Sequence, residues 1–265
     1  MNITAQSKKT IVGSILLDRS GSMNSILPVL IKGLQTFIDE TKGTATRAEE
    51  CYFRLTTFSD YKDVYFPEKT NETTRFGNIE NLNTEDLNFT TLGCTRLVDS
   101  AIEEANILQE KINELNDKNI MSWFVLLTDG IDNVSRKSHT ILKEKIEKLK
   151  ENNVNCIFMG ANIDAIKTGD IYGFDVDKSI QFDTNTTENE EDAPLYQRFR
   201  SLSDNVTQTF NDESQDMSFS TLQRSVSAPT QFNPRSNENQ SFQSSLPTLV
   251  RHVAEELDFD DDHVD

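Results

Sequence analysis

Two short, almost continuous apolar runs constrain the fold of this chain most strongly. They span residues 11–17 and 123–128. Runs of this kind are typical of strands that are covered on both faces, as in a parallel sheet. The segment from Leu27 to Ile38 that follows the first run has its apolar residues at helical spacing. Strands that alternate with helices predict an α/β fold with a doubly wound, mainly parallel sheet and helices on both faces.

The rest of residues 1–183 continues this alternation. The segments 53–58 and 63–66 flank a short polar turn and predict an antiparallel hairpin, which would place one antiparallel strand at the sheet edge. Further along the chain we expect a helix after Thr95, a charged helix around 142–149, a strand at 154–159 and a closing strand at 179–182.

The composition changes near residue 184. Residues 184–265 hold no lysine, five arginines and 16 acidic residues, a net charge of −11, and Ser, Asn, Gln and Thr dominate them. Such a segment buries too little apolar surface to offset its chain entropy. We therefore expect a domain at 1–183, a linker at 184–212 whose helix at 193–210 packs on the domain, and a disordered acidic tail at 213–265, with a possible short helix at 249–257.

The net charge excludes several classes of function. The chain has 44 acidic and 26 basic residues, a formal charge of −18 and an isoelectric point near 4.6. A non-specific nucleic-acid binder needs a basic face, and so does a protein that lies on an acidic membrane. No apolar run approaches the roughly 20 residues that cross a bilayer. We expect neither nucleic acid nor a membrane as a partner.

The first residues and the cysteines of the chain indicate the cellular compartment that we expect. The first ten residues are polar and lack the apolar core of a secretory signal. Cys51, Cys94 and Cys156 are an odd and widely spaced set, which favours buried thiols over a disulfide framework or a metal cage. Both observations predict a cytoplasmic protein.

Oxygen-bearing side chains follow the most apolar strands. Asp18, Ser20 and Ser22 come directly after the first strand, Thr95 precedes a helix, and Asp129 follows the strand at 123–128. In an open α/β sheet, ligands bind beyond the carboxyl ends of the strands, near the point where the strand order reverses. Two carboxylates and three hydroxyls are hard ligands that suit Mg²⁺. The alternative is that each residue is an ordinary turn or helix-cap residue.

These residues resemble the metal-ion-dependent adhesion site of the von Willebrand factor A (vWA) domain family. The family builds this site from a D-x-S-x-S motif, a threonine and an aspartate, and Asp18, Ser20, Ser22, Thr95 and Asp129 match them in order. The resemblance covers roughly residues 8–183 and implies a Rossmann-like sheet. It also implies Mg²⁺ or Mn²⁺ as the bound ion and a partner's Glu or Asp as the group that completes the coordination. The bracketing disulfide and the signal peptide of secreted members are missing, so the comparison is with intracellular and microbial members.

We therefore expect a metal-dependent protein-binding module, not an enzyme. The first alternative is a hydrolase or phosphotransferase that uses the same ion as a Lewis acid. It needs a general base near the ion, and Asp132 is the one nearby candidate. The second alternative is a scaffold that acts through its tail without a metal.

Other polar residues have simpler interpretations. A turn is favoured over support of the metal site for Asp132 and Asn133, and Arg19 either steers an acidic ligand or is a solvated loop residue. His139, His252 and His263 are scattered, which favours solvated surface over zinc binding.

The tail contains one candidate modification site. Residues 224–229 read Arg-Ser-Val-Ser-Ala-Pro. A phosphate on Ser227 would add charge and could dock in the basic pocket of an adaptor such as a 14-3-3 protein.

Overall fold

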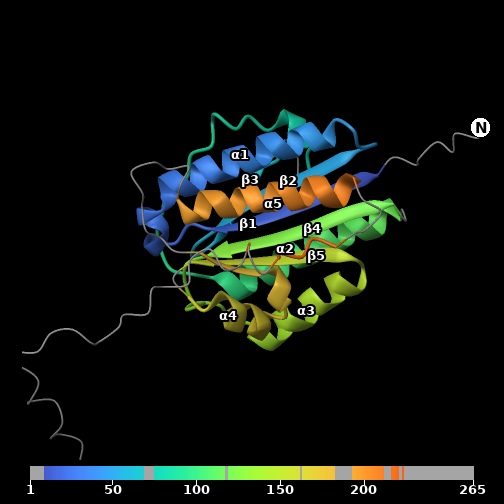
Figure 1. Cartoon of the computed structure of the whole chain (residues 1–265). Helices are drawn as coiled ribbons and strands as arrows, with labels where there is room; N and C mark the ends of the chain where they lie inside the picture. Colours follow the sequence, from blue (N-terminus) through green and yellow to red (C-terminus); the bar gives the residue numbers. More distant parts are fainter. Residues whose placement is uncertain are drawn as a thin grey trace, which may run out of the picture. The chain divides into compact units, whose positions relative to one another are not determined.

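One mostly parallel sheet organises the molecule (Figure 1). The computed structural model describes residues 9–68, 75–116, 119–161, 163–182, 193–211, 216–220 and 223. The strands are β1 (Thr10–Asp18), β2 (Cys51–Phe58), β3 (Lys62–Phe66), β4 (Ile120–Thr128), β5 (Val154–Ala161) and β6 (Ser179–Phe182). Their order in the sheet is β3-β2-β1-β4-β5-β6, and β3 alone is antiparallel to its neighbour. The predicted fold class and the predicted edge hairpin are confirmed.

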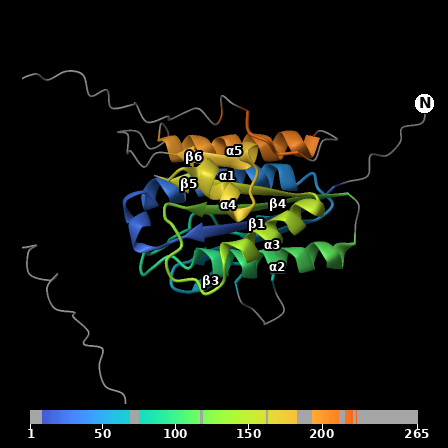
Figure 2. The ribbon, with the colours of Figure 1, turned by 90° about the horizontal axis from the view of Figure 1, so that it is seen from below.

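Helices cover both faces of the sheet (Figure 2). The helices α1 (Leu27–Ala45) and α5 (Pro194–Asn211) pack side by side on one face. The helices α2 (Leu97–Leu115), α3 (His139–Glu151) and α4 (Ala165–Tyr172) pack on the other. The alternation along β1 explains the two cores, because Ile15 and Leu17 belong to the first and Val12 and Leu16 to the second.

The final helix is an integral part of the domain. Its apolar stripe, predicted at 193–210, buries Leu195, Phe199, Leu202 and Val206. The contact with α1 depends on a glycine, because a Cβ on Gly33 would lie 2.4 Å from Cδ2 of Phe199. In the structure, α5 covers most of the predicted range and packs against α1.

A short segment beyond α5 also packs on the domain. Met217 and Phe219 are almost fully buried, although they lie within the segment that we expected to be a tail. The backbone N–H of Phe219 donates to the carbonyl of Asp177, and the N–H of Met217 donates to Asn155. The predicted helix at 249–257 and the rest of the acidic tail lie outside the described residues.

Three further expectations from the sequence concern a short helix, the cysteines and membrane-spanning segments. The helix α4 was not predicted, since its eight residues carry only a short apolar pattern. Cys51 and Cys156 are buried as expected, but Cys94 is exposed, so that prediction was wrong for one cysteine. None of the helices in the described part of the chain has the length and apolar character needed to cross a membrane.

Candidate metal centre

The strand order reverses at the centre of the sheet, between β1 and β4. These neighbours pair in parallel, so their carboxyl ends meet at the same edge. Asp18 is the last residue of β1, Asp129 follows β4, and Thr95 lies two residues before α2. The topology therefore brings the three predicted ligand segments to one edge of the sheet, as the general rule for such sheets requires.

Three of the five predicted donors, Ser20, Ser22 and Asp129, are linked through their side-chain oxygens. Oγ of Ser20 lies 3.1 Å from Oγ of Ser22, which donates to Oδ1 of Asp129 at 2.7 Å. Octahedral Mg²⁺ holds oxygens at 2.0–2.1 Å, so neighbouring ligands lie about 3 Å apart. The spacings among Ser20, Ser22 and Asp129 are those of ordinary hydrogen bonds, and they are also compatible with neighbouring oxygens around one small cation.

Asp18 lies at the floor of this group and is fully buried. Its Oδ1 accepts a hydrogen bond from the backbone N–H of Ser20, and its Oδ2 accepts one from the hydroxyl of Thr128 at 2.6 Å. Burial raises the pKa of Asp18 to about 6, and the charge of Asp129 adds to the rise, whereas the hydrogen bonds from Thr128 and Ser20 oppose it. The site holds this carboxyl group in place but disfavours its negative charge.

Asp129, the second carboxyl group, also lacks a cation that would favour its negative charge. Burial raises the pKa of Asp129 above its usual value, although the hydrogen bond from Ser22 lowers it. Within the described part of the chain, neither Asp18 nor Asp129 forms an ion pair with a lysine, arginine or histidine. A buried carboxylate beside a half-buried one, without a cation, is unfavourable, and a divalent ion would reduce that penalty.

Asn133 fixes the position of the threonine loop. Its side-chain oxygen accepts a hydrogen bond from the N–H of Thr95 at 2.9 Å, and its own N–H donates to the carbonyl of Thr95 at 3.1 Å. The hydroxyl of Thr95 lies 3.6 Å from the position that a Cβ on Gly130 would occupy. Asn133 therefore does more than form a turn, and the cap residue of α2 is Arg96 instead of Thr95.

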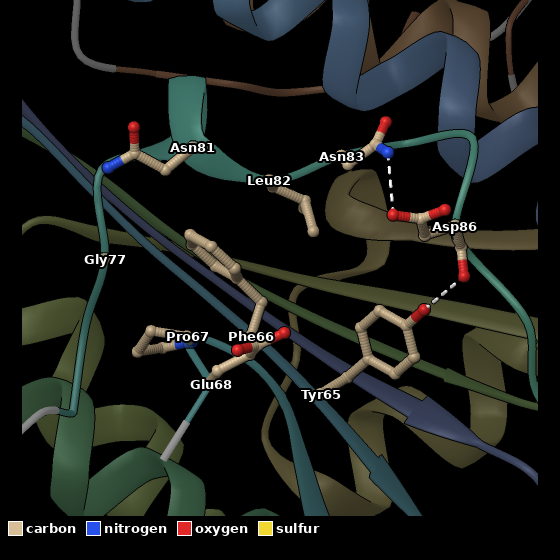
Figure 3. Close-up of a pocket in the computed structure, with 9 residues that line it drawn as sticks. All are labelled: Tyr65, Phe66, Pro67, Glu68, Gly77, Asn81, Leu82, Asn83 and Asp86. Carbon is tan, nitrogen blue, oxygen red and sulfur yellow. Dashed lines mark hydrogen bonds between the residues drawn. The ribbon is translucent and has the colours of Figure 1, made fainter. Parts of the chain in front are cut away.

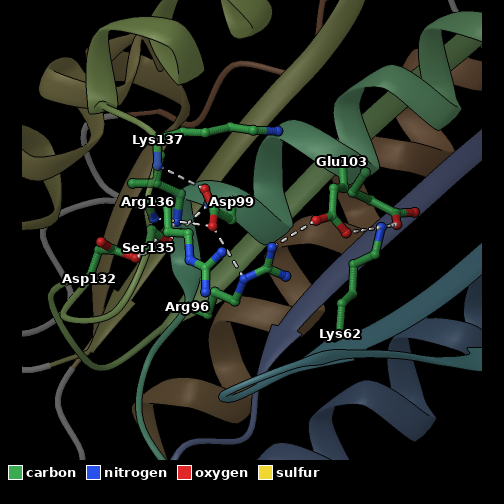
Figure 4. Close-up of polar contacts among 10 residues, drawn as sticks. Lys62, Arg96, Asp99, Glu103, Asp132, Ser135, Arg136 and Lys137 are labelled. Atoms are coloured by element: carbon green, nitrogen blue, oxygen red, sulfur yellow. Dashed lines mark hydrogen bonds and ion pairs between the residues drawn. The ribbon is translucent and has the colours of Figure 1, made fainter.

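Asp132 and Asp99 join the loop after β4 to the start of α2 (Figure 4). Oδ1 of Asp132 accepts from the N–H of Val98 and from the hydroxyl of Ser135. The carboxylate of Asp99 accepts from the backbone N–H groups of Arg136 and Lys137. The interpretation of Asp132 as a simple turn residue was wrong, because it supports the loop that carries Asp129.

The environment of Asp99 shows how a buried carboxylate is normally compensated. Burial alone would raise the pKa of Asp99. The N–H groups of Arg136 and Lys137, with the charges of Arg96 and Lys137, instead hold the pKa below its usual value. Nε of Arg96 lies 3.2 Å from Oδ2 of Asp99.

Arg19 is not a solvated loop residue. Its side chain is almost completely buried, and its guanidinium lies 4.9 Å from the centre of the Tyr61 ring. Nη1 of Arg19 donates to the carbonyl of Thr90, and the carbonyl of Arg19 accepts from the N–H of Leu92. Arg19 therefore joins the loop after β1 to the loop that leads to Thr95.

Asp60 is a structural residue of the site that sequence reasoning missed. Its carboxylate accepts a hydrogen bond from the N–H of Cys94 at 2.8 Å. Gly93 beside it has a φ of +75°, and a Cβ there would lie 2.1 Å from Oδ2 of Asp60. Only glycine fits between Asp60 and the backbone, and Gly93 also accepts the N–H of Gly21 from the D-x-S-x-S loop. The signal in the sequence was the glycine immediately before Cys94.

Other candidate sites are poorer. Across the described residues, no group of three or more His, Cys, Asp or Glu side chains is placed to hold a metal ion. His139 is exposed at the start of α3, and His252 and His263 lie outside the described residues. A pocket of about 610 Å³ lies beside β3, and no predicted ligand lines it (Figure 3). Part of its polar lining is already bonded, since the Tyr65 hydroxyl and the Asn83 amide both donate to Asp86.

Solved structures with this fold are numerous. A von Willebrand factor type A protein from Catenulispora acidiphila matches with a TM-score of 0.52 and 15% identity, over 76% of this chain and 43% of that one. The pilus adhesin SpaC from Lactobacillus rhamnosus GG, in an open conformation, matches with a TM-score of 0.52 and 11% identity, over 77% and 31%. The PilB minor pilin from Streptococcus sanguinis matches with a TM-score of 0.51 and 16% identity, over 77% and 63%.

These likenesses establish the fold of a vWA domain, because identities this low carry no more than the fold. This chain spans less than two thirds of each of the three structures. No protein-family model matches the sequence, and no curated protein matches it.

Proposed function

We propose that this chain is a protein-binding module that depends on a divalent cation, Mg²⁺ or Mn²⁺. Its ligands are Asp18, Ser20, Ser22, Thr95 and Asp129, and the partner contributes a Glu or Asp carboxylate. The observation that carries the proposal is the pair of carboxylates, Asp18 and Asp129, that no cation of the described residues compensates.

The donor set determines what a bound ion can do. A bound Mg²⁺ would supply an electrophilic position that a further carboxylate can fill. Two carboxylates neutralise the ion but do not saturate it, because the hydroxyls of Ser20, Ser22 and Thr95 are neutral. Asp18 and Asp129 would balance the charge of the ion, and the hydroxyls of Ser20 and Ser22 beside them would supply neutral oxygens. The partner's acidic residue then contributes the last negative oxygen.

Catalysis is the weaker interpretation of the same site. The hydrolase or phosphotransferase alternative depended on Asp132 as a general base. Its Oδ1 already accepts hydrogen bonds from Val98 and Ser135 and supports the loop after β4. A group in this structural role is poorly placed to take a proton from water, which favours binding over turnover.

The remaining proposals concern the setting of the module. Cys51, Cys94 and Cys156 all have free thiols, which favours a reducing compartment such as the cytoplasm. Phosphorylated Ser227 remains a candidate for binding to an adaptor protein, and it lies outside the described residues.

Calorimetric titration with Mg²⁺ and Mn²⁺ tests the metal site directly. We expect saturable binding to the wild type and none to Asp129→Asn, which removes one negative ligand with little change of shape. Asp170→Asn is the matched control, because Asp170 is exposed on α4, and it should bind as the wild type does. Equal binding by all three proteins would contradict the proposed site.

Affinity capture then separates the three functions. We expect the wild type to retain a protein partner in Mg²⁺ and to release it in EDTA, and Asp129→Asn to retain none. Retention in EDTA would favour the metal-independent scaffold. Metal-dependent hydrolysis of phosphate or ester substrates that Asp129→Asn abolishes would favour the enzyme.

A further inference from the structure

A groove lies beside the end of β3, away from the candidate metal centre (Figure 3). Its volume of about 610 Å³ is in the range of pockets that hold ligands. Residues 65–68 form one wall, and Gly77 with residues of the 81–86 loop forms the other. Phe66 pairs with Leu55 in the middle of β2, whereas the predicted metal ligands lie beyond the carboxyl ends of β1 and β4. We call this cavity the β3 groove.

A β-bulge gives the β3 groove an aromatic wall. Val64 pairs with Thr56 and Phe66 with Leu55, which leaves Tyr65 as an extra residue in the ladder. Neighbouring residues of a regular strand point to opposite faces. Tyr65 and Phe66, however, both line the groove, and both pack with the core beneath α1. A regular strand would place only one of the two rings there.

Direct contacts join the two walls of the groove. The hydroxyl of Tyr65 donates to the carbonyl of Asp86 at 2.7 Å and accepts the N–H of Asn88 at 3.3 Å. Phe66 and Leu82, one from each wall, are almost completely buried and belong to the same core. The groove is therefore preformed and has an apolar floor.

The charged side chains of the groove are acidic. Glu68 lines it from one wall and Asp86 from the other, and none of the described lining residues is basic. Glu80 and Glu85 are also exposed in the segment that forms the second wall. Within the described part of the chain, neither Glu68 nor Asp86 forms an ion pair. The groove thus combines apolar surface with uncompensated negative charge.

The basic residues nearest to the groove in the sequence are engaged elsewhere. Lys62 and Arg75 lie in the described segments that form the walls. Both pair with glutamates of α2, the helix on the opposite face of the sheet, namely Glu103, Glu104 and Glu110. Lys42 of α1, on the near face, pairs with Asp39. A cation for Glu68 and Asp86 therefore has to come from outside these segments.

We infer that the β3 groove binds a basic segment of a partner protein through an arginine or lysine side chain. The apolar stem of this side chain packs on Phe66 and Leu82. Its charged head lies between the carboxylates of Glu68 and Asp86, beside the ring of Tyr65. A second copy of this chain is a poor occupant, because two chains with a net charge of −18 repel each other.

Peptide selection in EDTA tests this inference. A random peptide library displayed on phage is selected on the full chain, and EDTA excludes binding through a metal ion. The selected peptides should contain arginine or lysine next to apolar residues. One of them, synthesised with a fluorescent label, should bind the double variant Glu68→Gln, Asp86→Asn about tenfold more weakly than the wild type, because its cation loses both carboxylates. Fluorescence anisotropy measures the affinity.

Two further variants separate the groove from the general charge of the chain. The double variant Glu147→Gln, Asp170→Asn makes the same change of charge at exposed positions on α3 and α4, and it should bind the peptide as the wild type does. Asn81→Trp keeps both carboxylates but fills the groove from an exposed position, and it should abolish binding. All of these variants replace exposed side chains, so their thermal midpoints should equal that of the wild type.

Three results would overturn the inference. The first is selection of peptides that lack a basic residue. The second is equal weakening of binding by the two double variants, which would indicate a general attraction to an acidic chain. The third is undiminished binding to Asn81→Trp. None of these results bears on the proposed metal site, which calorimetry with Mg²⁺ tests separately.

Discussion

Two fully buried carboxyl groups of this chain, Asp18 and Glu104, have opposite surroundings. Glu104 lies on the inward face of α2, where its Oε1 accepts from Nε of Arg54 at 2.7 Å and from the hydroxyl of Ser14 at 2.8 Å. Its Oε2 lies 3.4 Å from Nζ of Lys62. Asp18 has hydrogen-bond donors but no cation among the described residues. Within the described residues, the chain therefore supplies a cation for Glu104 but none for Asp18.

The comparison indicates that Glu104 has a structural role, whereas Asp18 lies where a ligand could reach its neighbours. Glu104 is enclosed by α2 and the strands β1 to β3, and no ligand reaches it. Asp18 is the last residue of β1 and contacts Ser20, which in turn contacts the exposed Ser22. A buried charge that the fold completes by itself stabilises the fold, whereas one that it leaves incomplete costs stability until a ligand binds.

The largest expected effect concerns Glu104. The variant Glu104→Gln leaves the guanidinium of Arg54, which is 4% exposed, without its charge partner. We expect the free energy of unfolding to fall by about 3–5 kcal/mol, as for other buried pairs that lose one member. Urea unfolding followed by circular dichroism measures it.

The neighbouring acid on α2 is the control for this experiment. Glu103 is 38% exposed and contacts Lys62 and Arg96 at the surface. The variant Glu103→Gln should cost at most about 1 kcal/mol, because surface ion pairs contribute little. Similar losses of unfolding free energy for Glu104→Gln and Glu103→Gln would show that the buried ion pair of Glu104 contributes no more than a surface pair.

The next effect is a pH dependence of the metal-free protein. The folded-state pKa of Asp18 is raised to about 6, above the ordinary value of 3.8, so folding favours the protonated form. The resulting stability is fully present below pH 3.8 and is lost as the pH rises through about 6. Relative to Asp18→Asn, the wild type in EDTA should lose up to roughly 3 kcal/mol between pH 4 and pH 8. Parallel pH profiles of the two proteins would show that burial of Asp18 is not costly.

Metal binding should reverse which of the two proteins, the wild type or Asp18→Asn, is the more stable. At a Mg²⁺ concentration of 100 times the dissociation constant, the wild type should gain about 2.7 kcal/mol, and Asp18→Asn should gain nothing. In EDTA at pH 8, however, Asp18→Asn should be the more stable of the two, since it lacks the uncompensated charge. Thermal unfolding in EDTA and in Mg²⁺ measures both, with Asp170→Asn as the control of equal charge. A variant that is less stable than the wild type in both conditions would mean that Asp18 is structural, like Glu104.

The convergence of Asp18 and Asp129 was more predictable from the sequence than the burial of Glu104. Asp18 and Asp129 directly follow apolar strands, and the carboxyl ends of parallel strands meet at one edge, so their convergence follows from the strand pattern. Glu104 was not recognised, because an acidic residue beside Glu103 resembles a solvated helix face. A signal was nevertheless available, since Glu104 falls within the inward stripe of Ala101, Ala105 and Leu108.

Loop contacts were the part that the sequence could not predict. The hydrogen bonds that the N–H groups of Thr95 and Cys94 donate to Asn133 and Asp60 depend on how two loops cross, and no periodic pattern encodes that. The short segment around Met217 and Phe219 is similar, because isolated apolar residues in a polar stretch give no signal of burial. Regular elements repeat their contacts along the sequence, whereas these contacts each occur once.

The smallest expected effect on stability concerns Asn133, which fixes the position of the loop that carries Thr95. The variant Asn133→Ala removes the side-chain oxygen that accepts the N–H of Thr95. Asn133 is exposed, so the loss should cost about 1 kcal/mol of stability in EDTA. Affinity for Mg²⁺ should fall by at least about tenfold, because residues that orient metal ligands tune affinity in this range. Glu104 needs no such loop, since it lies on a helix against strands. A loss of stability in EDTA without any loss of Mg²⁺ affinity would show that Thr95 is not a ligand, and that Asp18 and Asp129 hold the ion with the serines alone.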